Sequence, residues 1–358
     1  MKRVLITGGA GFIGSAVIRR LLGQDGHAVL NVDKLTYAAN PASLRPVETH
    51  PHYRFLNADI CDRAAMETAF TDFRPHAVMH LAAESHVDRS IDAPGDFIQS
   101  NIVGTYVLLH EARRYLDAAE PGVRESFRFH HISTDEVFGD LGEDGEFTED
   151  SPYRPNSPYS ASKAAGDHLV RAWGRTYGLP VILSNCSNNY GPYQFPEKLI
   201  PLVIIKCLNR REIPVYGDGR QVRDWLYVDD HAEALQLILE RGEPGESYNV
   251  GGGSERTNLQ LVETICSTLD ERHPCADGSY RDLIRFVEDR PGHDRRYAMN
   301  YEKLRRAFGW QPRETLESGL AKTVGWYLEN RWWWEPIMER TYSGQRLGLG
   351  APAAAAAG

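Results

Sequence analysis

Two short groups of side chains in this sequence have the types and spacing that acid–base chemistry requires. Thr134, Asp135 and Glu136 place a hydroxyl beside two carboxyl groups, and Tyr159 and Lys163 lie four residues apart. On a helix, residues four apart share one face. A tyrosine hydroxyl titrates at about 10, and a nearby ammonium group together with a bound nicotinamide cation would lower that pKa. Such a tyrosine can accept the proton of an alcohol during its oxidation, while two carboxyl groups can remove and add protons.

A glycine cluster near the start of the chain indicates the redox cofactor for that chemistry. Gly8, Gly11 and Gly14 follow an apolar run and open a helix-like stretch. Glycines in this position allow a tight turn and let backbone N–H groups approach a pyrophosphate at a helix N-terminus. The spacing is a variant of the usual dinucleotide fingerprint, and a simple strand-to-helix turn is the alternative interpretation.

Acidic residues at the ends of the next two apolar runs support a dinucleotide. Asp33 follows Gly14 by 19 residues, where a carboxylate accepts hydrogen bonds from the adenosine ribose. Because a carboxylate repels a 2′-phosphate, NAD is favoured over NADP, although Lys34 weakens that preference. Asp59 and Ile60 are expected to border the adenine. A turn role for Asp33 and a helix-cap role for Asp59 remain open.

Strand-like and helix-like stretches alternate through the first half of the chain and position these residues. The apolar runs are Lys2–Thr7, Ala28–Asp33, Tyr53–Asn57, His76–Leu81, Phe127–Ser133 and Pro180–Asn185. Helical stretches separate them, for example Gly11–Leu22, Ser100–Tyr115 and Ser160–Tyr177. This alternation predicts an α/β fold with a Rossmann-like, doubly wound parallel sheet. Ligands of such sheets bind at the carboxyl ends of the strands, which is where the candidate residues lie.

After Asn188 the alternation ends and glycine, proline and tyrosine become frequent. Later elements are predicted as helices at Asp229–Leu239, Leu259–Leu269 and Leu316–Trp326, and as a strand returning to the sheet at Ser247–Val250. We therefore expect a discontinuous cofactor domain of residues 1–187 and 223–250, and a smaller, mostly C-terminal α/β substrate domain of residues 188–222 and 251–335. Residues 336–358 form a C-terminal extension that is expected to be disordered from about Gly344.

Composition and charge exclude several classes of function. The chain has 358 residues, 42% of them apolar and 25% charged, with a formal net charge of −9. This acidic balance does not favour binding to nucleic acid, and no apolar run is long enough to cross a membrane. The five cysteines are odd in number and lack C-x-x-C spacing, which predicts reduced thiols, no metal site and a cytoplasmic location.

The combination of Gly8–Gly14 with Tyr159 and Lys163 resembles the extended short-chain dehydrogenase/reductase family. Thr134-Asp135-Glu136 narrows the resemblance to the nucleotide-sugar 4,6-dehydratases. Six segments resemble in particular the branch acting on dTDP-glucose: HLAAESHVDRSI (80–91), HISTDEVFGDL (131–141), SPYSASKAAGDHLVRAW (157–173), SNNYGPYQFPEKLIP (187–201), PVYGDGRQVRDWLYVDDHA (214–232) and DRPGHDRRYA (289–298). The resemblance runs from residue 2 to about 335. Ala39 and Phe138 depart from it, since the family usually has Gly and Tyr there.

The resemblance implies a hydro-lyase reaction that converts dTDP-glucose to dTDP-4-keto-6-deoxyglucose and water, with NAD regenerated in each turnover. Oxidation at C4 makes the C5 hydrogen acidic, which allows elimination of the C6 hydroxyl. By the same resemblance Tyr159 takes the O4 proton with Lys163 lowering its pKa, and Thr134 hydrogen-bonds O4. Glu136 removes the C5 proton, and Asp135, whose pKa an adjacent carboxylate can raise, protonates the leaving hydroxyl.

The resemblance also implies the binding residues. Those for NAD are Gly8, Gly11, Phe12, Ile13, Gly14, Asp33, Lys34, Leu35, Thr36, Asp59, Ile60, Leu81, Ala82, Ala83, Ser85, Ser100, Tyr159, Lys163 and Asn189. Those for the nucleotide sugar are Ser85, Thr134, Asn188, Lys198, Leu199, Pro214, Val215, Tyr216, Arg223, Asn258, Asp289, Arg290, Pro291, Gly292 and His293. Helices near 100–115 and 160–177 resemble those that pair in dimers of the family, which implies a homodimer. Packing of their apolar faces within one chain is the alternative interpretation.

Two other functions use the same scaffold. A nucleotide-sugar C4-epimerase or decarboxylase keeps the glycines, Tyr159 and Lys163 but needs no acid–base pair after the threonine, so Asp135 and Glu136 argue against it. The second alternative is a protein that binds NAD without catalysis. The intact set of candidate catalytic side chains argues against that interpretation.

Overall fold

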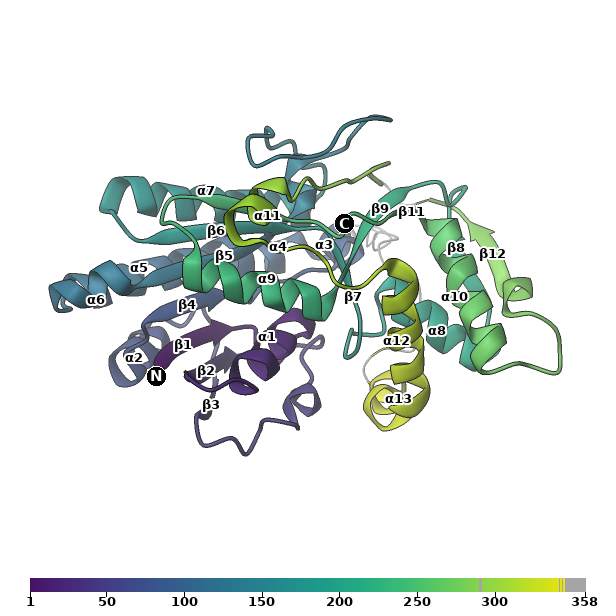
Figure 1. The fold of residues 1–358 in the computed structure, drawn as a ribbon, viewed down its shortest axis with the longest axis horizontal. Coiled ribbons are helices and arrows are strands. Elements are labelled where there is room, and N and C mark those ends of the chain that lie inside the picture. Colours follow the sequence, from purple (N-terminus) through teal and green to yellow (C-terminus); the bar gives the residue numbers. More distant parts are fainter. Residues whose placement is uncertain (290–291, 341, 343, 345–358) are drawn as a thin grey trace, which may run out of the picture.

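A seven-stranded parallel sheet forms the centre of the computed structural model, which describes residues 1–289, 292–340, 342 and 344 (Figure 1). Every pairing in this sheet is parallel. From one edge to the other the strands are β10 (Ser247–Val250), β6 (Val181–Cys186), β5 (Arg128–Thr134), β4 (Ala77–His80), β1 (Lys2–Thr7), β2 (His27–Asp33) and β3 (Tyr53–Asn57). The predicted doubly wound sheet is confirmed, including the late strand that returns to its edge.

Helices cover both faces of this sheet because alternate strand residues point to opposite sides. Val4 and Ile6 of β1 pack in one cluster with α1 (Phe12–Leu22) and α9 (Val228–Arg241). Leu5 belongs to the cluster of the opposite face, with α2 (Arg63–Phe73), α5 (Thr105–Asp117) and α7 (Pro158–Tyr177). Figure 1 shows α1 and α9 together in front of the sheet.

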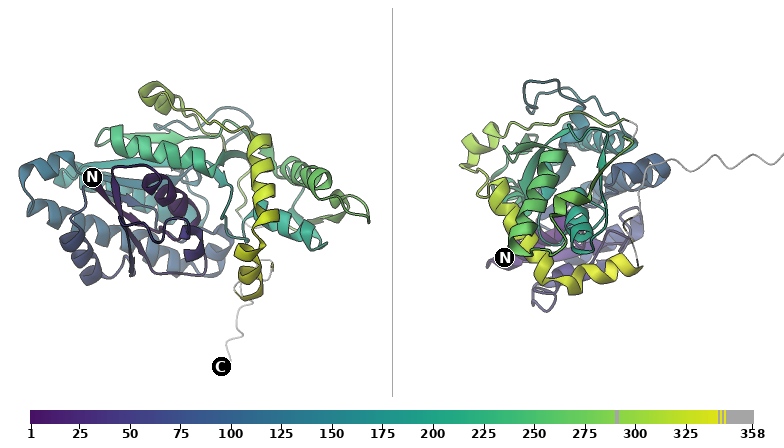
Figure 2. Two further views of the ribbon diagram at one scale, coloured as in Figure 1. Left: turned by 60° about the horizontal axis from the view of Figure 1, so that its bottom comes forward. Right: turned by 90° about the vertical axis from the view of Figure 1, so that its right-hand side faces the viewer.

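A second region lies beside the sheet and has its own apolar core (Figures 1 and 2). Its helices are α8 (Leu199–Leu208), α10 (Asn258–Arg272), α12 (Leu316–Glu329) and α13 (Arg331–Arg340). Its strands form two small sheets: β11 (Glu255–Thr257), β9 (Val222–Tyr227) and β7 (Asn188–Tyr190) in one, and β12 (Ile284–Val287) with β8 (Ile213–Tyr216) in the other. The division of the chain into two domains at the predicted boundaries stays a prediction.

The remaining elements are short. They are a 3₁₀ turn at Pro41–Leu44, α3 (Val87–Asp92), α4 (Pro94–Phe97), a π-helical stretch at Ile98–Gly104, α6 (Pro121–Ser126), 3₁₀ turns at Asp135–Phe138 and Tyr280–Leu283, and α11 (Glu302–Phe308). The helix predicted from Ser100 therefore begins with π-helical geometry and becomes α-helical only at Thr105. The predicted tail lies outside the described residues from 345 onward.

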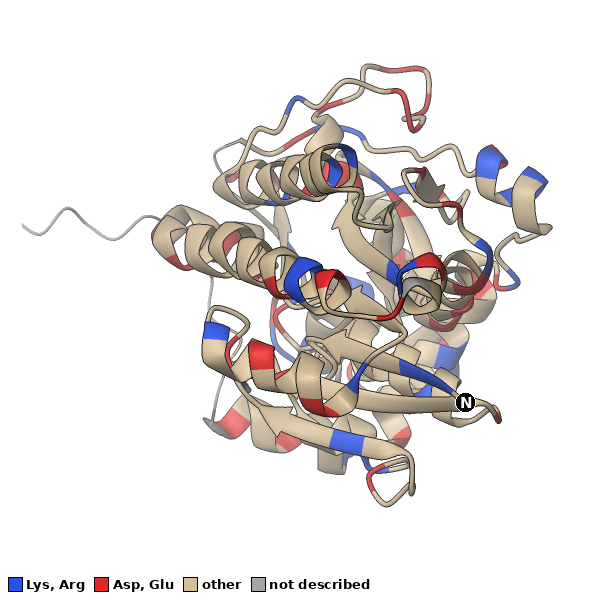
Figure 3. Cartoon of the chain, turned by 90° about the vertical axis from the view of Figure 1, so that its left-hand side faces the viewer, with Lys and Arg blue, Asp and Glu red and all other residues tan. Residues whose placement is uncertain are grey.

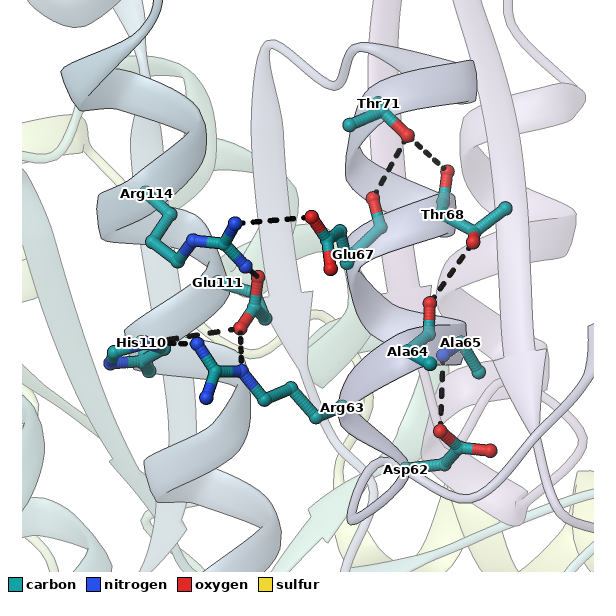
Figure 4. Close-up of polar contacts among 10 residues, drawn as sticks. All are labelled: Asp62, Arg63, Ala64, Ala65, Glu67, Thr68, Thr71, His110, Glu111 and Arg114. Atoms are coloured by element: carbon teal, nitrogen blue, oxygen red, sulfur yellow. Dashed lines mark hydrogen bonds and ion pairs between the residues drawn. The ribbon is translucent and has the colours of Figure 1, made fainter.

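Basic and acidic residues both occur on the helices visible in Figure 3. Where α2 and α5 pack, they form a network around the buried Glu111 carboxylate, which lies 2.8 Å from Arg63 Nε and 2.9 Å from Arg114 Nη1 (Figure 4). Arg114 continues the network to Glu67 of α2. None of the helices in the described part of the chain combines the length and apolar character needed to cross a bilayer.

Candidate active site

The turn between β1 and α1 is built for close approach of another group to its backbone. Gly8 has φ +72°, and a Cβ there would lie 2.6 Å from the backbone nitrogen of Ala82. A Cβ at Gly14 would lie 2.2 Å from the carbonyl oxygen of Gly8. Only glycine fits both positions without displacing backbone. The turn brings the start of α1 against the end of β1, which suits the diphosphate of a dinucleotide.

Asp33, at the end of β2, fixes this turn from the side. Its carboxylate accepts hydrogen bonds from the backbone N–H of Ala10 at 2.9 Å and of Leu35 at 2.8 Å. Burial raises its pKa, whereas those two hydrogen bonds act in the opposite direction. Beside it, Lys34 Nζ lies 3.3 Å from Asp59 and 3.1 Å from Ser100 Oγ. The turn role left open for Asp33 is therefore present, and its carboxylate also lines the main cavity.

The candidate acid–base pair follows directly from the end of β5. Thr134 caps the 3₁₀ turn, because its Oγ1 accepts a hydrogen bond from the backbone N–H of Glu136 at 3.3 Å and donates to Asp135 Oδ1 at 3.1 Å. Asp135 is only 2% exposed, and its Oδ2 has no hydrogen-bond partner among the described residues. Burial and the neighbouring Glu136 raise the pKa of Asp135 well above its usual range. Both effects favour the protonated form of this carboxyl group.

Tyr159 and Lys163 lie on the first turns of α7 and are both buried. A capping box formed by Ser157 and Ser160 starts this helix, with Pro158 in its first turn. Lys163 Nζ donates a hydrogen bond to the carbonyl oxygen of Ile132 on β5 at 2.8 Å. The helix thus holds its lysine against the strand that carries Thr134 and the acid–base pair.

The predicted lowering of the Tyr159 pKa is not present in the protein alone. Burial raises this pKa well above its usual range, and the nearby carboxylate of Glu136 raises it further, while a hydrogen bond with Thr134 acts in the opposite direction. Burial also lowers the pKa of Lys163. The expectation concerned the protein with its nicotinamide cation bound and stays a prediction for that state. In the protein alone, desolvation of the phenolate determines the direction of the shift.

One cavity of about 360 Å³ joins these groups, a size typical of small-molecule sites. Of the predicted residues, those that line it are Gly8, Gly11, Phe12, Ile13, Gly14, Asp33, Lys34, Thr36, Ile60, Leu81, Ala82, Ala83, Ser85, Ser100, Thr134, Asp135, Glu136, Tyr159, Lys163, Asn188, Asn189, Lys198 and Leu199. The glycine turn, the acid–base pair and the Tyr159–Lys163 pair therefore share one space, with residues of the second region at its border.

Two predicted cofactor residues lie beside the cavity rather than on its wall. Leu35 has φ +55° and a side chain that is 36% exposed. Asp59 pairs with Lys34, and its Oδ1 accepts the backbone N–H of Cys61. The cap of α2 is Asp62 and not Asp59.

The remaining predicted substrate residues lie away from the main cavity. Pro214 and Tyr216 line a neighbouring hollow, whereas Val215 is buried in the core of the second region. Asn258 begins α10. Asp289, Gly292 and His293 form a loop in which His293 Nδ1 lies 2.6 Å from Asp289 Oδ1. Arg290 and Pro291 lie outside the described residues.

Arg223 on β9 has a buried guanidinium group with several backbone partners. It donates to the carbonyl oxygens of Val222 at 2.8 Å and Asp294 at 2.9 Å. Its Cζ also lies over the ring of Tyr297, at 4.4 Å from the ring centroid. The same positive charge lowers the pKa of Asp135, although burial outweighs it. Arg223 therefore contributes positive charge to the surroundings of Asp135 and holds the backbone at Asp294 by a hydrogen bond.

Sequence reasoning missed several residues of the site. Glu197 borders both the main cavity and the neighbouring hollow. It accepts hydrogen bonds from Tyr37 at 3.0 Å and Arg89 at 2.9 Å, and thereby ties the segment before α8 to the sheet region. Tyr342, in the C-terminal extension, is buried and lines the hollow beside Tyr216. The acid next to Lys198 in an apolar stretch was a signal for Glu197, whereas no pattern in the sequence indicated Tyr342.

Comparison with known proteins places this geometry in a family. The family model described as GDP-mannose 4,6 dehydratase matches residues 5–323. A dTDP-glucose 4,6-dehydratase of Neisseria meningitidis serogroup B is 58% identical over 354 residues, which cover 98% of this chain and all of the relative.

Solved structures agree with this relationship. The dTDP-glucose 4,6-dehydratase of Streptomyces venezuelae, crystallised with NAD, is 44% identical, covers 94% of this chain and 99% of its own, and gives a TM-score of 0.86. The UDP-glucose 4-epimerase of Thermus thermophilus, also with NAD, is 31% identical, covers 92% and 99%, and gives a TM-score of 0.80. The chain belongs to the GDP-mannose 4,6 dehydratase family and, within it, to the dTDP-glucose 4,6-dehydratases.

Proposed function

We propose that this chain converts dTDP-glucose to dTDP-4-keto-6-deoxyglucose and water, with NAD as its cofactor. The observation that supports this most is the Asp135–Glu136 pair in the same cavity as Tyr159 and Lys163. A C4-epimerase has no use for a buried acid and a base beside that pair. When bound, NAD supplies the acceptor for the hydrogen that leaves C4 and the donor that returns it to C6.

Tyr159 is the base for the first step. It takes the proton of the C4 hydroxyl while the C4 hydrogen is removed, and the C4–O bond becomes a carbonyl. Thr134 orients that oxygen through its hydroxyl group. Because burial and Glu136 hold the Tyr159 pKa high in the protein alone, the positive charges of Lys163 and of the oxidised nicotinamide are needed to favour its phenolate.

Glu136 and Asp135 then carry out the elimination. The C4 carbonyl makes the C5 hydrogen acidic, because its loss gives a stabilised enolate, and Glu136 removes it. Asp135 donates its proton to the C6 hydroxyl, which leaves as water as the C5–C6 double bond forms. The raised pKa of Asp135 favours the protonated form that this step requires. Each such acid or base step typically contributes about 10²–10⁴-fold.

The nucleotide is assigned to the border between the two regions. Lys198 and Leu199 line the main cavity, and Pro214 and Tyr216 line the adjoining hollow, so a diphosphate can extend from one to the other. Positively charged Lys198 and Arg223 suit that diphosphate. The loop of Asp289 and His293 and the start of α10 at Asn258 complete the proposed nucleotide site.

Transfer of label within one molecule tests the proposal. The chain is incubated with dTDP-glucose carrying deuterium at C4, and the product is analysed by mass spectrometry and NMR. Deuterium at C6 of a 4-keto product, without exchange into an unlabelled companion substrate, is expected. A galactose product without a ketone would instead support the epimerase, and no turnover at all would support a non-catalytic NAD-binding protein. Parallel reactions with UDP-glucose measure the preference for thymidine.

We also propose that the chain forms a homodimer through α5 and α7. Tyr106 and Tyr177 on these helices are 44% and 38% exposed, and both pack against Trp173 at centroid distances of 5.9 and 5.3 Å. Light scattering is expected to give twice the mass of the chain, and Tyr106→Asp to give the monomer. Phe286→Asp, at an exposed aromatic of β12, is the matched control and should leave the mass unchanged.

A cytoplasmic location is proposed as well. All five cysteines are free, as expected for a reducing compartment. Fractionation of the source cell is expected to find the chain in the cytoplasmic fraction, and recovery with the membrane or from the medium would contradict the proposal.

A further inference from the structure

Asp167 lies one turn beyond Lys163 on α7, and the proposed reaction makes no use of it. Its side chain is fully buried. Oδ2 accepts hydrogen bonds from Ser133 Oγ and Tyr153 Oη, both at 2.8 Å, and Oδ1 lies 3.1 Å from His131 Nε2. A buried carboxylate is costly unless it is paired and hydrogen-bonded. The two hydrogen bonds to Oδ2, together with the nearby His131 and Lys163, favour the charged form of Asp167.

Two side chains of α7 therefore bind successive residues of β5. Lys163 donates to the carbonyl oxygen of Ile132, and Asp167 accepts from the hydroxyl of Ser133. The next residue along the strand is Thr134, which caps the turn of the acid–base pair. Loss of the Asp167 contact would release the strand at the point where the candidate catalytic residues begin.

Asp167 is also the main negative neighbour of Lys163. The titratable groups that act on the Lys163 ammonium are Asp167 on α7 and Cys186 on β6, and Lys163 in turn acts on His80 of β4 and His131 of β5. Burial lowers the Lys163 pKa, whereas Asp167 raises it. Conversely, His131 and Lys163 help to hold the Asp167 pKa below its usual range. Arg171 of α7 acts on His131 and Tyr153, and Tyr153 also contacts His168 of the same helix.

We propose that Asp167 is a positioning residue that keeps Lys163 charged and fixes the end of β5, so that Tyr159 can act as a base. The proposal rests on the proposed dehydratase reaction, in which Tyr159 must lose its proton before C4 is oxidised. Glu136 and Asp135 on the 3₁₀ turn and Cys186 on β6 all oppose the phenolate. Without the Asp167 charge, Lys163 would lose the carboxylate that favours its cationic form.

Asp167→Asn is the central test, because it keeps the size of the side chain and removes its charge. When kcat is measured as a function of pH, the acidic limb of the profile is expected to move to higher pH. The reason is that the Tyr159 pKa rises when Lys163 loses positive charge. A shift of about one unit corresponds to a tenfold loss of kcat on that limb. Activity should recover in part as the pH is raised. Asp167→Glu retains the charge and is expected to keep the limb near its wild-type position.

A direct titration separates this role from a structural one. In NAD-loaded protein, the tyrosinate absorbance of each variant minus that of its Tyr159→Phe partner reports the Tyr159 pKa, which Asp167→Asn should raise. Asp230→Asn is the matched control, because Asp230 is a buried carboxylate on α9 that accepts the backbone N–H of Glu314. It should lower stability without moving the acid limb. A fall of kcat by the same factor at every pH, with an unmoved tyrosinate titration, would overturn the proposal.

A measurement on the unmodified side chain covers the case in which Asp167→Asn does not fold. The NMR signal of the Asp167 carboxyl carbon, assigned by its loss in Asp167→Glu, is expected at the ionised position at neutral pH. A protonated Asp167 would overturn the proposal, since a neutral group cannot hold Lys163 charged. Absence of wild-type turnover with dTDP-glucose would instead contradict the proposed function, and the two titrations would still decide the role of Asp167.

Discussion

The two regions of this molecule carry their functional residues in different ways. In the sheet region the chemistry is local: Thr134, Asp135 and Glu136 are consecutive, and Tyr159 and Lys163 share one helix face. In the second region the proposed nucleotide residues come from separate elements and from a loop, and only tertiary packing brings them near one another. The difference follows from function, because proton transfer needs fixed distances on rigid strand ends, whereas a nucleotide can be held by scattered contacts.

Hydrogen bonds next to the main cavity join the two regions. Glu197, which precedes α8, receives hydrogen bonds from Tyr37 and Arg89 of the sheet region. Lys198 donates to the carbonyl oxygen of Ser85 at 2.8 Å. Both residues border the main cavity. Mutations on the sheet side are therefore expected to change the chemical step, and mutations on the other side to change binding.

Glu136→Gln should give the largest effect. Loss of the base is expected to lower kcat by about 10²–10⁴-fold, while oxidation at C4 remains possible because Tyr159 and Lys163 are intact. The measurement is deuterium incorporation at C5 from heavy water, together with NADH absorbance in a single turnover. Incorporation at the wild-type rate would show that another group removes the C5 proton.

Asp135→Asn is expected to give the next largest effect. The amide has the shape of a protonated carboxyl group but cannot give up a proton to the C6 hydroxyl, so water loss should slow by at least about 10²-fold. Formation of NADH in a single turnover should remain near its wild-type rate. If NADH formation is abolished instead, the assignment of Tyr159 as the base for C4 oxidation and Asp135 as the acid for water loss is wrong.

Local patterns explain why the sheet region could be predicted from the sequence. Apolar runs ending in Gly8, Asp33 and Ser133 predicted strands whose carboxyl ends meet at one edge, and the sheet confirms that arrangement. The spacing of Tyr159 and Lys163 predicted their common face. These features depend on residues close in sequence, where helix and strand geometry fixes the outcome.

Features that depend on distant residues could not be predicted in this way. The pKa of Tyr159 rises because of burial and of Glu136, and neither burial nor that proximity is contained in a Tyr-x-x-x-Lys motif. Strands β8 and β12 pair across about 70 residues of chain, and no period in their short sequences indicates it. Tyr342 reaches the hollow of Tyr216 only through the packing of the extension.

Tyr216→Ala tests the second region and should affect binding more than chemistry. The loss of an aromatic face in the proposed nucleotide site is expected to raise KM for dTDP-glucose about tenfold, equivalent to about 1.4 kcal/mol, with little change in kcat. Phe286→Ala is the matched control, because Phe286 lies on the paired strand β12, is 58% exposed and lines neither cavity. A fall in kcat without a change in KM would contradict the proposal that the second region serves binding and the sheet region serves the chemical step.

The stability of the two regions should also respond differently to acid. This difference concerns unfolding at low pH and not turnover at neutral pH. All buried histidines of the described residues lie in segments 1–187 and 223–250: His27, His80, His86, His130, His131 and His231. Burial lowers the pKa of both His130 and His231 to about 3. The unfolded chain, in which histidine titrates near 6.5, therefore binds protons that the folded protein does not. Stability from these residues is complete above about 6.5 and is lost as the pH falls from there toward 3.

His231→Gln isolates this contribution. The wild type loses up to about 1.4 kcal/mol per pH unit through this residue over that window, whereas the variant does not, so the gap in unfolding free energy between them should narrow between pH 7 and pH 5. Urea titrations measure it, with the exposed His52→Gln as control. Hydrogen exchange at the lower pH should find β5 and α9 opening before α8 and α10. A constant gap between wild type and variant would mean that His231 takes up its proton without unfolding, and the contrast in acid response between the regions would then need another cause.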